Sequence, residues 1–169
     1  MSRRELKKYL SGLDQEQLTG QFLELYDKFA NVKTYFDFVF NPKEEKLSGE
    51  ARQKILHEYF PVRGKRPKQR LSVAHKYIRH FKSLGVDSSV LTELMLFNLE
   101  TALRFSAKRE TRYDSFTTSM LKSFRELVDY TSEQGISTIY KDKIQSISQE
   151  VSRQRWNNSE SFSELADSL

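Results

Sequence analysis

The chain has 169 residues, of which 28 are Lys or Arg and 23 are Asp or Glu, so its formal net charge is +5. Its length suits one domain with a core of its own, and 37% hydrophobic residues with 12% aromatic residues exclude a disordered chain. Cysteine is absent, which excludes disulfides and thiolate metal sites and favours a cytoplasmic location, and no apolar run is long enough to predict a membrane span.

Two capping boxes predict the N-terminal helices. Ser2 is followed three residues later by Glu5, and Asp14 is followed at the same distance by Gln17. The first helix is short. The second is long, with apolar residues at three- and four-residue steps, and we interpret residues 35–40 as its buried end.

Proline and glycine predict the next boundaries. Asn41 and Pro42 are typical of a helix start, so a third helix is expected from there to Phe60. Residues 61–67 contain two prolines and a glycine and predict a loop. A fourth helix follows this loop and is expected to end at Gly85.

The C-terminal half predicts three further helices. The fifth is capped by Asp87 or Ser88 and is apolar nearly all round, which indicates the central helix of the fold. The sixth ends before Gly135, and the seventh keeps helical apolar spacing as far as Val151. Residues 157–169 are rich in Ser, Glu and Asp and are expected to be a polar, mobile tail.

These elements predict an all-α fold, with a single domain over residues 1–156. Six to seven helices joined by short connections are expected to lie antiparallel, either in a bundle or in a short stacked-hairpin array of solenoid type. The sequence shows no repeat of fixed period, which favours the bundle.

Several stretches together resemble an uncharacterised family of small helical bacterial proteins, a domain of unknown function. They are RELKKYL, LELYDKF, VKTYFDFVFNPKEEKL, EYFPVRGKRPKQRLSVAHKYIRHF and SMLKSF, and the likeness extends from Arg4 to about Trp156. The resemblance implies a single-domain protein of the bacterial cytosol. It implies no catalytic or binding residue.

The excess of positive charge is local. Residues 61–86, the basic segment, hold eight Lys or Arg and no acid, whereas the rest of the chain has 20 basic and 23 acidic residues. Lys and Arg bind nucleic acids through their phosphates, so RNA or DNA is the expected partner, with an acidic protein as another. The candidate contacts are Arg63, Lys65, Arg66, Lys68, Arg70, Lys76, Arg79 and Lys82. The other interpretation is a solvated face that neutralises neighbouring acids.

A run of aromatic residues at 35–40 supports an alternative function. Its large side chains, the aromatic patch, are Tyr35, Phe36, Phe38 and Phe40. Exposed aromatic residues are typical of interface cores, so the protein is alternatively a protein-interaction or scaffold module that self-associates through this patch. Packing in the core is the more common role of such residues.

The sequence contains no convincing catalytic motif. The Gly-Lys pair at 64–65 lacks the earlier glycine and the following Ser or Thr of a phosphate-binding loop. His75 and His80 are five residues apart and therefore point to different sides of a helix, which does not favour a metal site. We assign no catalytic residue, cofactor or metal, and interpret the protein as a non-enzymatic binding module. An enzyme with a dispersed site, for example from His75, Arg79 and Glu100, stays open.

Overall fold

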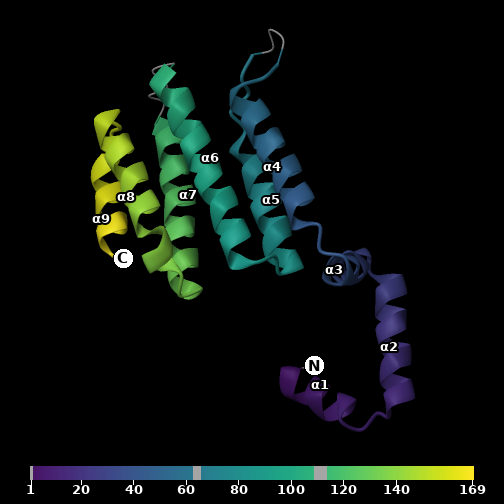
Figure 1. Ribbon diagram of the computed structural model, residues 1–169. Coiled ribbons are helices and arrows are strands. Elements are labelled where there is room, and N and C mark those ends of the chain that lie inside the picture. The colour runs from purple at the N-terminus through teal and green to yellow at the C-terminus, as the bar shows by residue number, and fades with distance from the viewer. Residues whose placement is uncertain (1, 63–65, 109–113) are drawn as a thin grey trace. The chain divides into compact units, whose positions relative to one another are not determined.

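The computed structural model describes residues 2–62, 66–108 and 114–169. Over these residues it contains nine α-helices and no strand, which confirms the all-α class (Figure 1). The helices are α1 (Arg3–Leu10), α2 (Gln15–Lys28), α3 (Ala30–Phe40), α4 (Glu44–Tyr59), α5 (Leu71–Leu84), α6 (Ser88–Lys108), α7 (Asp114–Glu133), α8 (Ser137–Arg153) and α9 (Ser159–Asp167). The expected number of six to seven helices is therefore too low.

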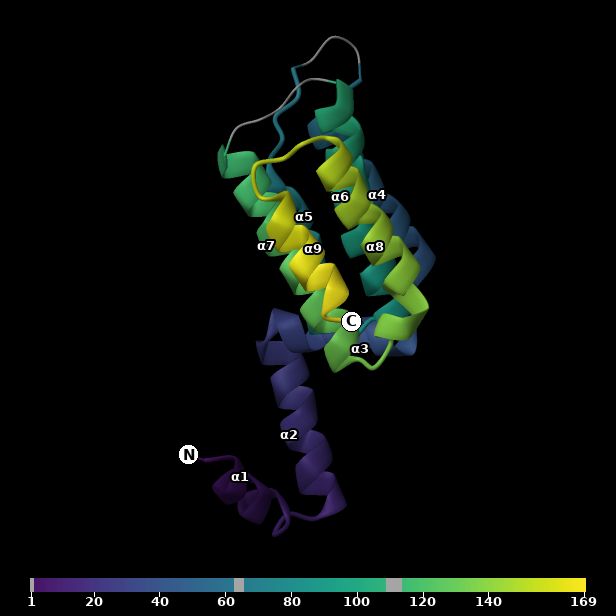
Figure 2. The ribbon, with the colours of Figure 1, turned by 90° about the vertical axis from the view of Figure 1, so that its left-hand side faces the viewer.

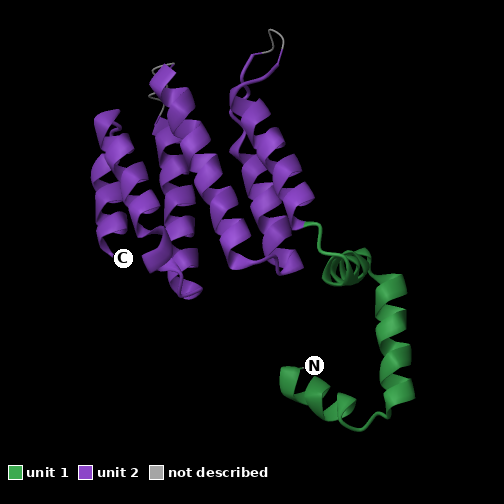
Figure 3. Cartoon of the chain, viewed as in Figure 1, with its two compact units in different colours: residues 1–43 green, residues 44–169 purple. Residues whose placement is uncertain are grey.

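The chain forms two compact units, Met1–Lys43 and Glu44–Leu169, called unit 1 and unit 2 (Figure 3). The described buried hydrophobic residues all belong to unit 2 and run from Ala51 to Ala166. In unit 1, none of the residues of α1, α2 and α3 is buried. Among the described residues, those of unit 2 alone form a hydrophobic core.

In unit 1 both capping boxes form as predicted. Glu5 N–H donates to the Ser2 hydroxyl at 3.3 Å, and Gln17 N–H donates to the Asp14 carboxylate at 2.8 Å. The long second helix that we expected is instead divided into α2 and α3, because Phe29 between them has extended backbone with φ −118° and ψ 110°. The correction adds one helix to the expected count.

The break at Phe29 lets α2 and α3 pack on each other. The rings of Phe22 and Phe36 meet edge to face with centroids 6.3 Å apart, and the Tyr26 hydroxyl donates to Asp37 at 2.8 Å. These contacts hold the pair together without burying a side chain completely.

Unit 2 is a stack of three antiparallel helix hairpins, α4–α5, α6–α7 and α8–α9. Figure 2 shows two layers, with α4, α6 and α8 in one layer and α5, α7 and α9 in the other. The stacked-hairpin arrangement, rather than a closed bundle, therefore describes this unit. The helix α6 contacts α4, α5, α7 and α8, and most of its residues are buried, so it is the central helix as predicted.

The last helix replaces the polar tail expected over residues 157–169. The Phe162 side chain is completely buried, and its ring lies 4.8 Å from that of Phe124 and 5.9 Å from that of Trp156. One fully buried aromatic side chain and Ala166 give this short Ser- and Glu-rich helix an apolar face against α7 and α8.

Candidate polyanion-binding surface

The basic segment lies on the loop before α5 and on α5 itself. Arg63 and Lys65 fall outside the described residues. The other six candidate contacts are exposed: Arg66, Lys68, Arg70, Lys76, Arg79 and Lys82. Exposure alone does not make a cation available, because a carboxylate neighbour cancels its field.

Arg70 is engaged by Glu58 at the end of α4. Its Nε and Nη2 atoms donate to the two carboxylate oxygens at 3.0 and 2.8 Å. The Glu58 carbonyl oxygen also accepts from the backbone N–H groups of Lys68 and Gln69, each at 3.0 Å. The hydrogen bonds from the Arg70 side chain hold the pKa of Glu58 below its ordinary value, although burial acts in the opposite direction. Arg70 therefore fixes the loop to α4 and is not free to bind a ligand.

Lys82 is likewise engaged, through contacts with α7. Its Nζ donates to Glu126 at 2.7 Å and lies 5.3 Å from the centroid of the Tyr130 ring. Within the described residues, Arg66, Lys68, Lys76 and Arg79 form no ion pair. The charge of Lys68 nevertheless helps to lower the pKa of Glu58, so Arg66, Lys76 and Arg79 are the members of the predicted set that are most available to a ligand.

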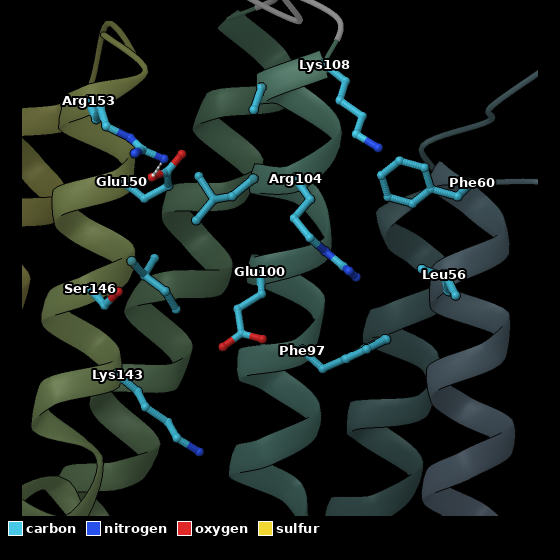
Figure 4. Close-up of a pocket in the computed structure, with 13 residues that line it drawn as sticks. Leu56, Phe60, Phe97, Glu100, Arg104, Lys108, Lys143, Ser146, Glu150 and Arg153 are labelled. Carbon is cyan, nitrogen blue, oxygen red and sulfur yellow. Dashed lines mark ion pairs between the residues drawn. The ribbon is translucent and has the colours of Figure 1, made fainter.

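A groove crosses the layer of α4, α6 and α8. Its volume is about 870 Å³. Figure 4 shows side chains from all three helices facing it. We call it the basic groove, and it is lined by Leu56, Phe60, Phe97, Glu100, Leu103, Arg104, Ala107, Lys108, Lys143, Ser146, Ile147, Glu150 and Arg153.

Two cations of the basic groove have no carboxylate partner within the described residues. Arg104 and Lys108 lie one helical turn apart on α6, and their charged groups are 5.9 and 5.6 Å from the centroid of the Phe60 ring. In contrast, Arg153 forms an ion pair with Glu150, and Lys143 donates to a carboxylate of α6. Like charges at this spacing repel each other, so a bound anion would lower the electrostatic repulsion between Arg104 and Lys108.

Helix dipoles do not cancel the positive charge of this pair. The helices α4, α6 and α8 end on the side of unit 2 where α5, α7 and α9 begin (Figure 1). The negative ends of three helices are thus matched by the positive ends of three others. The charge of this end of the unit is therefore set by its side chains, which include Arg66, Lys68, Arg104 and Lys108.

The sequence did not point to Arg104 and Lys108. They follow an apolar run in the central helix, where two cations near a C-terminal end have an ordinary explanation in the helix dipole. One sequence feature could have indicated them: Glu100, Arg104 and Lys108 follow one another at four-residue spacing and therefore lie on one side of the helix. It becomes informative only when α4 and α8 are known to flank that side.

The residues named for a dispersed active site are not brought together. His75 on α5 is hydrogen-bonded to Ser123 on α7 at 3.1 Å, whereas Glu100 on α6 faces the basic groove in the other layer. Among the described residues there is also no group of three His, Asp or Glu side chains that could hold a metal ion.

The aromatic patch lies on α3 and is not packed into a core. Tyr35 and Phe40 are exposed, and Phe36 and Phe38 are half-buried. Phe36 and Phe40, with residues of α2, line a second groove of about 570 Å³. Packing in a core is the more common role of aromatic residues, but within unit 1 none of the four side chains of the aromatic patch is buried.

Comparison with known proteins yields one family. A family model described as "Family of unknown function (DUF6155)" matches residues 1–169, the whole chain. No curated protein and no solved structure gives a significant match. None of the helices in the described part of the chain has the length and apolar content that a membrane crossing needs.

Proposed function

The chain belongs to this family of unknown function, which carries no assigned activity, and we propose that it is a non-enzymatic binding module for RNA or DNA. A bacterial, cytoplasmic setting is part of the proposal. The observation that carries it is a pair of cations, Arg104 and Lys108, that line a groove open to a ligand and form no ion pair within the described residues. Lys and Arg bind nucleic acids by neutralising their phosphates, whatever the base sequence.

The loop before α5 extends this surface. A backbone hydrogen bond joins Lys68 to Glu58 near the end of α4, two residues before Phe60 of the basic groove. Arg66 and Lys68 are exposed on this loop and form no ion pair within the described residues. A polynucleotide in the basic groove is thus expected to contact the loop as well, while Arg70 keeps the loop in place through Glu58.

Fluorescence anisotropy with labelled RNA and DNA tests the proposal, using protein freed of copurifying nucleic acid. Affinity should fall on a log–log line between about 50 and 200 mM salt, because bound phosphates release counterions. The double variant Arg66→Glu with Lys68→Glu should weaken binding at least about tenfold. Arg70 is left unchanged because its loss would disturb the loop.

The matched control reverses the charge of two exposed lysines on α4, outside this loop: Lys46→Glu with Lys54→Glu. This control changes the net charge equally and should lower affinity far less. Absence of binding at low salt, or equal losses in the two double variants, would refute the proposal.

The exposure of the aromatic patch favours a second candidate function, self-association through α3. Phe40 is 76% exposed, which is unusual for so large an apolar side chain. Light scattering at rising concentration should show a dimer or larger species that Phe40→Ser abolishes. Ile139 on α8 is 75% exposed, so Ile139→Ser is a matched control that should have no effect. A wild-type protein that stays monomeric at high concentration excludes this function.

A further inference from the structure

Phe60 is held in a fixed position at the edge of the basic groove. Its backbone N–H continues the hydrogen bonding of α4, with 2.7 Å to the Leu56 carbonyl oxygen. Its ring meets the Phe105 ring edge to face, with centroids 5.9 Å apart. The side chain is half-buried, so the part that remains accessible faces the groove in which Arg104 and Lys108 also lie (Figure 4).

The other phenylalanine of the groove, Phe97, has a different environment. Its ring is covered by the Arg52 guanidinium at 5.2 Å, and Arg52 is 3.9 Å from the carboxylate of Glu93. The charge beside Phe97 is therefore compensated by the protein. The charge beside Phe60 is not, since Arg104 and Lys108 form no ion pair within the described residues.

An aromatic ring beside two cations that form no ion pair within the described residues matches the chemistry of a single-stranded polynucleotide. An unpaired base stacks on an aromatic side chain or on a guanidinium plane, while the adjoining phosphates bind the cations. A duplex presents phosphates outside and keeps its bases paired and stacked inside, so an aromatic side chain cannot stack on them unless the duplex opens.

We infer that the basic groove binds a single strand in preference to a duplex, with one base stacked at Phe60 and the neighbouring phosphates held by Arg104 and Lys108. This inference rests on the proposed function and names its ligand class. It also assigns two roles: Phe60 stacks on an unpaired base, whereas the two cations bind the phosphates.

The wild-type protein tests this inference without any substitution. Three labelled ligands are compared by anisotropy at one salt concentration: a single strand, the same sequence as a duplex, and an abasic strand with the same number of phosphates. Stacking of one base is worth enough that the single strand should bind at least about fivefold more tightly than either of the others. Equal binding of the single strand and the abasic strand would overturn the inference.

Paired substitutions assign the roles. Phe60→Leu should weaken single-strand binding at least about fivefold with an unchanged salt dependence, and Phe97→Leu should have little effect. Arg104→Gln with Lys108→Gln should weaken binding and reduce the slope of log affinity against log salt by up to about 1.4. Circular dichroism checks folding, and if Phe60→Leu is unfolded the abasic comparison decides.

Failure of the inference is distinguishable from failure of the proposed function. If duplex and single strand bind equally, with losses in the cation variants and none in Phe60→Leu, the protein binds polyanions but does not stack a base. If none of the ligands binds at low salt, both the inference and the proposed function are wrong.

Discussion

Glu58 is a buried carboxylate whose charge is compensated by one arginine. Its side chain is only 11% exposed and accepts both hydrogen bonds of the Arg70 fork. Glu58→Gln keeps the size of the side chain and removes its charge. We expect it to lower the free energy of unfolding at neutral pH by about 1–2 kcal/mol. This lies at the low end of the range of about 1.5–3 kcal/mol for hydrogen bonds to charged groups, because the Arg70 side chain is 54% exposed to solvent.

The same substitution has a defined pH dependence. Because the pKa of Glu58 is lower in the folded than in the unfolded chain, its charge stabilises the fold at neutral pH, and this contribution is lost as the pH falls through the lowered pKa. The difference between wild type and Glu58→Gln in urea unfolding should thus be largest near pH 7 and should shrink as the pH falls below the ordinary pKa of Glu and through the lowered pKa of Glu58. Glu50→Gln, at an exposed position of the same helix, should show no such trend. A difference that persists in acid contradicts the assigned role.

Single residues also mark the limit of what the sequence predicts about the site. The sequence identifies Arg70 and Lys82 as cations of one segment. Their carboxylate partners, however, are Glu58, 12 residues away along the chain, and Glu126, 44 residues away. Such distances carry no local signal, so the sequence cannot distinguish an occupied cation from an available one. Arg104 and Lys108 were missed for the same kind of reason, because the ring that both approach, Phe60, follows α4 and is more than 40 residues away in the sequence.

At the scale of elements, local signals predict helix ends better than helix packing. Capping boxes and left-handed glycines act within a few residues, and both capping boxes and the end of α5 at Gly85, with φ 66°, follow the prediction. The break at Phe29 has no side-chain cap and no glycine or proline, so no local signal announces it. The same holds for α9, whose burial depends on partners in α7 and on Trp156.

The packing of α9 makes a testable prediction about this element. Phe162 is completely buried, and replacing it by alanine leaves a cavity between Phe124 and Trp156. Phe162→Ala should therefore cost about 3–5 kcal/mol of unfolding free energy. The same substitution at Phe40, whose side chain is 76% exposed, is the control and should cost little. Similar losses for both variants, or none for Phe162→Ala, would show that α9 is not part of the core in solution.

At the scale of the whole molecule, burial divides the chain unequally. The described core residues lie in unit 2, whereas the helices of unit 1 bury none of their side chains. Hydrophobic burial is the main source of folding free energy, while a helix cap adds only about 1 kcal/mol. Stability should accordingly be a property of residues 44–169.

Thermal unfolding of a protein restricted to residues 44–169 tests this division. We expect one cooperative transition, with a midpoint within a few degrees of that of the full chain, because the excluded segment contributes no buried side chain to the core. The basic groove and the loop before α5 lie wholly within these residues, so single-strand affinity should also be retained. Residues 1–43 alone should show weak helicity without a cooperative transition, since short helices without a core are marginal in water. A shortened protein that unfolds without cooperativity would place unit 1 within the stabilising core, and one that folds but loses affinity would place part of the nucleic-acid surface in unit 1.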